Sequence, residues 1–310
     1  MNYLLIIGGL ILLILGGNWL LKSAVALSLK LNISKAVIGL TVVSFATSAP
    51  ELIVSLNAAL NGSSDLALGN IIGSNIANLG LVLGITLLLG SIQVAKNFYK
   101  IDWPVMMIAS GLLFLFLAND KVIEQNEGIL LVSFLIIFIL YLLKKQKNIV
   151  VDEIVEKEIQ IPNYKTALLL ILGGFGLWAG SELLINGATA LAVDFGVTER
   201  VIGVTIVSIG TSIPELAASI IAVVKKEKAI SLGNLIGSNI FNILAVIGIT
   251  SLITPISLSD ERLFTNDIYW MIGISFIILP LVLLPKKYLL TWKEGCILLL
   301  TYTAFIYMII

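Results

Sequence analysis

The chain has 310 residues, of which 58% are hydrophobic and only 12% are charged, and its mean hydropathy is +1.06. A soluble domain of this length carries about 25% charged residues, so the composition indicates an integral membrane protein embedded in a lipid bilayer. Lys+Arg and Asp+Glu balance at 19 each, and we expect no nucleic-acid partner. Histidine is absent and the single cysteine is Cys296, which excludes histidine-ligated metals, Ser-His triads and an internal disulfide. We expect neither a cofactor nor an enzyme.

Apolar stretches bounded by charged or turn residues predict an all-α protein with ten transmembrane helices. They lie near residues 3–21, 36–60, 66–90, 103–118, 128–143, 166–186, 201–224, 230–253, 268–285 and 295–310. The first stretch could be taken for a signal peptide. It lacks a positively charged start, however, and residues 167–190 repeat its pattern, so we assign it to the fold.

The charges in the connections predict how the helices face. If the N-terminus is outside, the inner connections hold 16 Lys and Arg residues and the outer connections hold 3. Because positive charge is retained on the cytoplasmic side, we expect a multi-pass protein of the cell (inner) membrane with both termini outside. Residues 144–165 would then be a cytoplasmic linker between a first half, 1–143, and a second half, 166–310.

The two halves repeat each other at an offset of 164 residues. Between Val37 and Gly84, 24 of the 48 positions are identical to those of the second half. Each half has five predicted helices, an odd number, so the second copy must be inverted in the membrane. The connection Asn61–Asp65 has no lysine, whereas its counterpart Lys225–Ala229 has three. Inverted repeats with broken helices are typical of secondary transporters that bind substrate near the midplane.

The first repeated motif, "FATSAPE" and "IGTSIPE", predicts a broken helix at the centre of each half. Pro50 cannot donate a backbone hydrogen bond, and the freed polar groups need partners at membrane depth. A carboxylate such as Glu51 costs roughly 2.5–3.5 kcal/mol at the bilayer centre, and its repeat Glu215 would repel it. Since no Lys or Arg lies within the predicted helices, a bound cation is the partner that offsets both costs.

The candidate ligands in these motifs are all oxygen atoms, which predicts a hard cation: Na⁺, Ca²⁺ or Mg²⁺. Two glutamates match the charge of one Ca²⁺, which also accepts the flexible coordination that Mg²⁺ avoids. The second repeated motif, "GNIIGSNIAN" and "GNLIGSNIFN", places Ser74 and Asn78 on one helix face, and Ser238 and Asn242 likewise. A single copy of the first motif would fit a simple proline kink, and a single copy of the second would fit a helix-packing motif. Because each motif occurs in two aligned copies, ion binding is favoured.

At these motifs the sequence resembles the cation/Ca²⁺ antiporter superfamily, specifically the prokaryotic sodium/calcium exchangers, over essentially the whole chain. The resemblance implies a central diamond of four ion sites and exchange of three Na⁺ for one Ca²⁺, with the first and sixth helices sliding across the other eight. The implied Ca²⁺ ligands are Glu51, Glu215 and the backbone carbonyls of Thr47 and Thr211. The implied Na⁺ ligands are the backbone carbonyl of Ser44 with Thr47, Ser48 and Ser74 in the first half, and the backbone carbonyl of Ser208 with Thr211, Ser212 and Ser238 in the second. Asn78 and Asn242 would lie in the middle.

Two positions depart from the pattern of the resembled family. Ala46 stands where the pattern has Gly, although alanine supplies the same carbonyl. Position 242 is Asn, where several relatives, including potassium-dependent exchangers, carry Asp. Two carboxylates rather than three argue against K⁺ co-transport.

We therefore expect a monomeric antiporter that exchanges Na⁺ for Ca²⁺ by alternating access, electrogenic and independent of K⁺. An H⁺/Ca²⁺ or other divalent-cation antiporter is the nearest alternative, because protons on the same glutamates could replace Na⁺. A cation channel is a more distant one. Glu182 lies toward the outer end of the sixth predicted helix, where an interfacial position is favoured over a place in the ion pathway.

Overall fold

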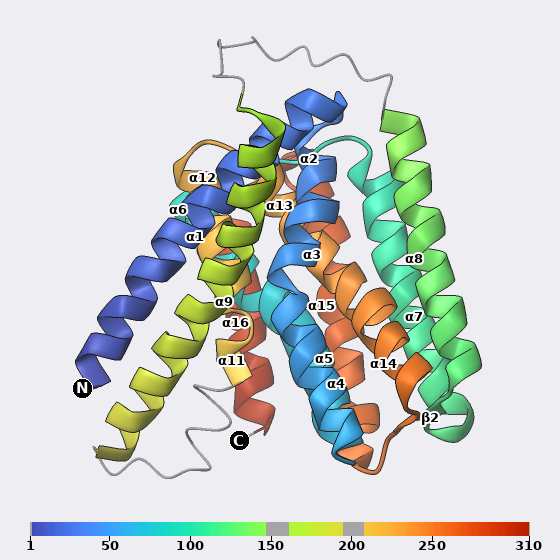
Figure 1. Ribbon diagram of the computed structural model, residues 1–310. Coiled ribbons are helices and arrows are strands. Elements are labelled where there is room, and N and C mark those ends of the chain that lie inside the picture. The colour runs from blue at the N-terminus through green and yellow to red at the C-terminus, as the bar shows by residue number, and fades with distance from the viewer. Residues whose placement is uncertain (1, 147–160, 195–207, 310) are drawn as a thin grey trace.

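The computed structural model describes residues 2–146, 161–194 and 208–309, and these parts of the chain are almost entirely helical (Figure 1). Most of the predicted linker, and the first seven residues of the predicted span 201–224, lie outside the described residues. Segments labelled η are π-helical, with a wider turn than the α-helix.

The described elements before the linker are α1 (Asn2–Leu31), α2 (Lys35–Ile38), η1 (Gly39–Val43), α3 (Ser44–Thr47), α4 (Ala49–Leu60), α5 (Ser64–Ala77), η2 (Asn78–Val82), α6 (Leu83–Leu89), η3 (Phe98–Asp102), α7 (Trp103–Asp120) and α8 (Gln125–Gln146). Those after it are α9 (Asn163–Asp194), α11 (Ser208–Gly210), α12 (Ile213–Val224), α13 (Lys228–Phe241), η5 (Asn242–Ile247), α14 (Gly248–Ile253), η6 (Leu263–Asp267), α15 (Ile268–Leu283) and α16 (Trp292–Ile309).

Seven helices of the described chain are long and apolar enough to cross a membrane, or eight when the bent pair α2–α3 and α4 is counted as one span. The bend in that pair is 43°, and it falls at the predicted break. The two remaining predicted spans correspond to α12, a shorter apolar helix, and to α16, which has 18 residues but a charged first turn. The first turn of α16 contains Lys293 and Glu294, and α12 follows a part of the chain outside the described residues. The protein is thus a multi-pass membrane protein, and the number ten stays a prediction.

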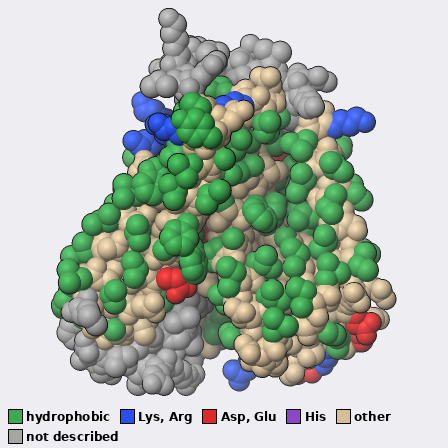
Figure 2. Space-filling model, in the orientation of Figure 1, with side chains coloured by type: hydrophobic (Ala, Val, Ile, Leu, Met, Phe, Trp, Pro, Cys, Tyr) green, Lys and Arg blue, Asp and Glu red, His purple; other side chains and the backbone are tan. Residues whose placement is uncertain are grey.

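Figure 2 shows a flank covered by hydrophobic side chains, as contact with lipid requires. The Lys and Arg side chains visible in this view lie toward the two ends of the molecule, most of them at the upper end. Both chain termini lie at the lower end in Figure 1.

The helices α5 and α13 form the buried centre of the bundle. Every residue of α13 from Ile230 to Phe241 is buried, whereas α1, α8 and α9 expose large apolar side chains on their outer faces. The bounds of α5 and α13 are offset by 164 residues, and so are those of α4 and α12. Figure 1 shows α4 toward the lower end and α12 near the upper end.

The helices α1 and α9 lie side by side at one edge of the molecule (Figure 1). Their backbones meet through glycines: a Cβ added at Gly16 would lie 2.7 Å from the backbone nitrogen of Leu177, and one at Gly180 would lie 2.8 Å from that of Leu13. Small residues at such contacts let membrane helices pack closely.

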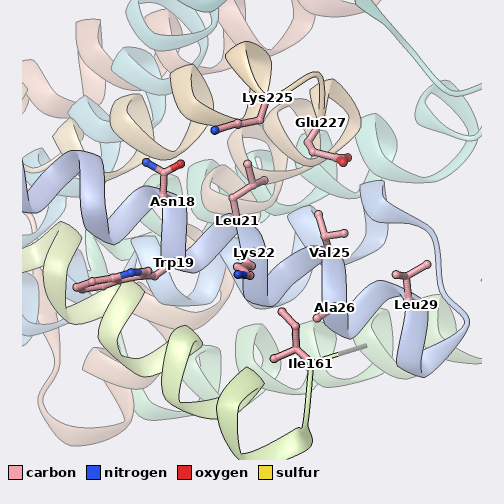
Figure 3. A pocket seen from close by; sticks show the side chains of 10 residues that line it. All are labelled: Asn18, Trp19, Leu21, Lys22, Val25, Ala26, Leu29, Ile161, Lys225 and Glu227. Atoms are coloured by element: carbon pink, nitrogen blue, oxygen red, sulfur yellow. The ribbon is translucent and has the colours of Figure 1, made fainter. Parts of the chain in front are cut away.

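Two hollows lie beside this pair. One, of about 510 Å³, lies between α1 and the turn from α12 to α13 and includes Lys22, Lys225 and Glu227 in its lining (Figure 3). The other is an apolar groove of about 750 Å³ between α9 and the broken helix α2–α4. None of the residues predicted to bind ions lines the first hollow. The two helices pack most extensively on each other, and both also contact α12.

Two short antiparallel ribbons, which the sequence did not predict, join loops of the two halves. Strand β1 (Ile92–Gln93) pairs with β4 (Leu289–Leu290), and β2 (Val122–Ile123) pairs with β3 (Ile256–Ser257). Strands of two residues are too short to show a period-2 pattern in sequence.

The contact between α13 and the segment α2–η1 has no room for side chains. A Cβ at Gly237 would lie 2.2 Å from Ser44 Oγ and 2.5 Å from the carbonyl oxygen of Leu40. Gly111 on α7 is the comparison, because no atom of the described chain lies within 4 Å of a Cβ added there. We predict that Gly237→Ala destabilises the protein by about 1–3 kcal/mol through overpacking, whereas Gly111→Ala does not. Thermal unfolding of the two purified variants in detergent measures this, and equal melting temperatures would contradict the described packing.

Candidate cation site at the centre of the bundle

Both predicted helix breaks are present, with matching backbone geometry. In the first half α3 ends at Thr47, and Ser48 (φ −88°, ψ 4°) leads into α4. In the second half Ser212 (φ −88°, ψ 2°) leads into α12. Each resumed helix has its proline and its glutamate in the first turn, where the proline ring is tolerated and the positive end of the helix dipole favours a negative charge.

Glu51 and Glu215 are fully buried. One carboxylate oxygen of Glu215 accepts from Ser48 Oγ at 3.3 Å and from Ser238 Oγ at 3.4 Å. Its other oxygen and both oxygens of Glu51 have no hydrogen-bond partner among the described residues. Removing a carboxylate from water without a partner is costly. The ion pairs within the described chain, Lys35–Glu227 and Lys121–Glu261, do not involve these two glutamates.

The hydroxyl groups of each break meet the second motif of the other half. Thr47 Oγ1 donates to Asn234 Oδ1 at 3.1 Å and lies 3.4 Å from Ser238 Oγ. With the two halves exchanged, Thr211 Oγ1 of the second break lies 3.3 Å from Ser74 Oγ of the first half. Residues 137 to 191 positions apart in the sequence therefore share one polar centre.

Four asparagines of α5–η2 and α13–η5 complete the centre. Asn78 Nδ2 donates to Asn239 Oδ1 at 3.2 Å, and Asn242 Nδ2 donates to Asn75 Oδ1 at 3.0 Å. The Oδ1 atoms of Asn78 and Asn242 then have no hydrogen-bond partner among the described residues. Both side chains are fully buried, so these oxygens are acceptors left over for another ligand.

The structure brings most of the predicted site residues together. Thr47, Ser48, Ser74, Thr211, Glu215 and Ser238 lie within hydrogen-bonding distance of a residue of the other half. Glu51, Ser212, Asn78 and Asn242 are buried with oxygens that no described residue contacts.

Ser44 and Ser208 are the two residues predicted to contribute backbone carbonyls. Ser44 also reaches the other half, because its Oγ lies 2.8 Å from the carbonyl oxygen of Gly39 and 2.9 Å from that of Asn234, so its own carbonyl is the group left to bind an ion. The backbone of Ser208 opens α11, and its side chain lies outside the described part of the structure.

Three buried asparagines of the site, Asn75, Asn234 and Asn239, were absent from the predicted set. They form the contacts above from the middle of the repeated "GN" and "GSN" stretches. Each of these asparagines has an asparagine at the equivalent position of the other half, and this repetition is the sequence signal that marks them. Glu182 is exposed on α9 and has no part in these contacts.

The chemistry of this centre fits a hard cation. Its acceptors are two carboxylates, hydroxyls and amide oxygens, the ligand types that Na⁺ and Ca²⁺ accept. Among the described residues no cluster of three or more His, Cys, Asp and Glu side chains could hold a metal ion, so neutral oxygens must supply most of the ligands.

A family model described as sodium/calcium exchanger protein matches residues 1–144 and 165–310. The chain belongs to this exchanger family. The match spans both halves and both copies of each motif, and the family is one of membrane transporters for cation/Ca²⁺ exchange rather than of enzymes.

Relatives of this exchanger span its whole length. It is 39% identical to the putative antiporter CaxA of Alkalimonas amylolytica, over 97% of this chain and 96% of that protein. It is 30% identical to the sodium/calcium exchanger MaX1 of Methanosarcina acetivorans, over 98% and 97%.

The fold is shared with solved exchanger structures. A structure of the sodium-calcium exchanger NCX_Mj soaked with zero Na⁺ and Ca²⁺ superposes with a TM-score of 0.83 at 28% identity, covering 100% of this chain and 99% of that chain. Another, soaked with 2.5 mM Na⁺ and 10 mM Sr²⁺, gives a TM-score of 0.83 at 29% identity and covers 99% of each.

The two buried glutamates predict a large effect of charge removal on transport by this exchanger. Glu51→Gln and Glu215→Gln should each lower Ca²⁺ uptake at least about 100-fold, because a second-shell change alone costs 10–100-fold in metal affinity and these changes remove a ligand charge. Uptake of radioactive Ca²⁺ into membrane vesicles measures this. Glu182→Gln, the same substitution at an exposed position of α9, is the control. Unchanged uptake in either buried variant would contradict the assignment.

Proposed function

We propose that this exchanger is a Na⁺/Ca²⁺ antiporter that works by alternating access, is electrogenic and does not require K⁺. The observation that carries the proposal is the buried pair Glu51 and Glu215, which has no cationic partner among the described residues and is surrounded by neutral oxygens. A cation bound between them offsets their desolvation and their mutual repulsion.

The proposed Ca²⁺ ligands are both glutamates and the backbone carbonyls of Thr47 and Thr211. The proposed Na⁺ ligands are the glutamates together with Ser44, Thr47, Ser48, Ser74, Ser208, Thr211, Ser212 and Ser238, with Asn78 and Asn242 in the middle. The two ions share the same carboxylates, so they compete. This competition favours exchange over leak, because the empty, doubly negative site resists the conformational switch.

The proposed exchange of three Na⁺ for one Ca²⁺ moves one net charge per cycle, and this makes the proposed transport electrogenic. One feature of the site supports independence of K⁺. Position 242 carries a neutral amide whose Nδ2 donates to Asn75, so no third carboxylate is available for K⁺.

The proposed architecture is ten helices in two inverted halves, residues 1–143 and 166–310, with a cytoplasmic linker at 144–165. The equal bounds of α4–α5 and α12–α13 at an offset of 164, and the opposite ends at which α4 and α12 lie, support it. The termini lie together at one end, and most visible basic side chains lie at the other, which supports termini outside in the cell (inner) membrane.

The proposed moving part is the pair α1 and α9. Close glycine contacts join these two helices to each other, and the two hollows lie beside them, next to their contacts with the bundle. Sliding of this pair would open the site to each side in turn. A monomer suffices, because one chain supplies both carboxylates.

Radioactive Ca²⁺ uptake into proteoliposomes loaded with Na⁺, K⁺ or choline at equal pH tests the proposal. We expect uptake from Na⁺-loaded vesicles alone, and faster uptake when valinomycin and K⁺ set a potential that favours the predicted net charge movement. Uptake that follows a pH gradient without Na⁺ would select the proton-coupled alternative. Equal uptake from all three loads, with no dependence on a counter-ion, would indicate a channel.

The variant Glu215→Gln and protein-free vesicles are the controls. Loss of Na⁺-driven uptake in the variant ties the flux to the buried site. Insensitivity of the rate to the imposed potential would contradict electrogenic exchange while leaving Na⁺ coupling intact.

A further inference from the structure

The four asparagines at the crossing of α5 and α13 form a closed network that joins the two halves. Asn75 Nδ2 donates to the backbone carbonyl of Asn239 at 3.3 Å, and Asn239 Nδ2 donates to that of Asn75 at 3.1 Å. This reciprocal clasp fixes both side chains, and Met271 Sδ lies 3.7 Å from Asn75 Nδ2. With their nitrogens engaged, Asn75 and Asn239 each present a side-chain oxygen to the other pair.

That second pair takes its orientation from the clasp. Asn242 Nδ2 donates to Asn75 Oδ1, and Asn78 Nδ2 donates to Asn239 Oδ1. An asparagine amide is a donor at one end and an acceptor at the other. Since the donor ends of Asn78 and Asn242 are held, their free ends are oxygens, and both are buried without a partner in the described chain.

The packing places the segments that carry these oxygens against the helices that carry the carboxylates of the site. The segment η5, which begins at Asn242, packs on α4, which carries Glu51, and η2, which begins at Asn78, packs on α12, which carries Glu215. A rotated amide would present an NH₂ group there, and its positive end would repel a cation.

From this network we infer that Asn75 and Asn239 are positioning residues for cation binding: they hold the amides of Asn242 and Asn78 so that oxygen, not nitrogen, faces the ion. They lie on the buried central helices and not on the pair α1 and α9. The acceptor orientation is therefore kept while the site opens to either side. The inference deepens the proposed function and depends on it only for the presence of a cation at this centre.

The test exploits the symmetry of a carboxylate. In Asn242→Asp both outer atoms are oxygens, so the residue needs no partner to orient it. Asn75→Leu, which removes the partner, should weaken Ca²⁺ binding about tenfold or more in the Asn242 background, as second-shell losses do. In the Asn242→Asp background the same change should cost under about twofold, a non-additivity that a purely structural role does not produce.

The readout is the Ca²⁺-dependent rise in melting temperature of the purified protein in detergent, which gives an apparent affinity without any counter-ion. Melting temperatures without Ca²⁺ show that each variant folds. Asn239→Leu with Asn78→Asp repeats the design in the other half. An equal loss in both backgrounds, or no loss in Asn75→Leu, would overturn the inference. A wild-type protein that Ca²⁺ does not stabilise would contradict the proposed function as well, and failure of Na⁺-driven uptake alone would leave this inference standing.

Discussion

The structure depends on two negative charges held where the protein offers no positive charge to meet them. Glu51 and Glu215 are fully buried, and three of their four carboxylate oxygens have no hydrogen-bond partner in the described chain. A native fold keeps an uncompensated buried charge only where something outside the chain neutralises it. The surrounding hydroxyl and amide oxygens make a hard cation the fitting partner.

Other features of the fold follow from the need to bring these charges together. The breaks at Ser48 and Ser212 place each glutamate in the first turn of a helix, with hydroxyls beside it. The helices α5 and α13 cross in the buried centre and supply the remaining oxygens from both halves. Their close contact with the broken helix requires glycine at positions such as Gly237, where any side chain would meet Ser44. Within the described residues, the outer helices α1, α8 and α9 carry none of the residues of this site.

Much of this could be predicted from the sequence, because the repeat preserves polar residues that an apolar helix has no reason to keep. Both breaks followed from the motifs. The amide network did not, since spacing shows which residues share a helix face but not which amide end is held by a neighbour. Asn75 and Asn239 were therefore overlooked although they repeat. The two-residue ribbons and the hollows beside α1 also come from tertiary packing, which leaves no periodic signal.

The symmetry of the halves and its departures also have a physical reading. The clasp between Asn75 and Asn239 is nearly symmetric, with distances of 3.3 and 3.1 Å. Around this clasp the halves differ. Asn234 accepts a hydrogen bond from Thr47 of the other half, whereas its repeat counterpart, Asn70, donates to Ser55 of its own half. A transporter built from two equal halves must break its symmetry to open on one side at a time. The asymmetry lies in the broken helices and their contacts, whereas the contacts between the central amides are nearly the same in both halves.

Equilibrium titration of the purified protein with Ca²⁺, with and without Na⁺, tests most directly whether one shared cation site lies between the two carboxylates. Isothermal calorimetry should show one Ca²⁺ per chain, competition by Na⁺ but not by K⁺, and loss of binding in both Glu51→Gln and Glu215→Gln. Ca²⁺ binding that is indifferent to Na⁺, or that survives in either variant, would contradict the account.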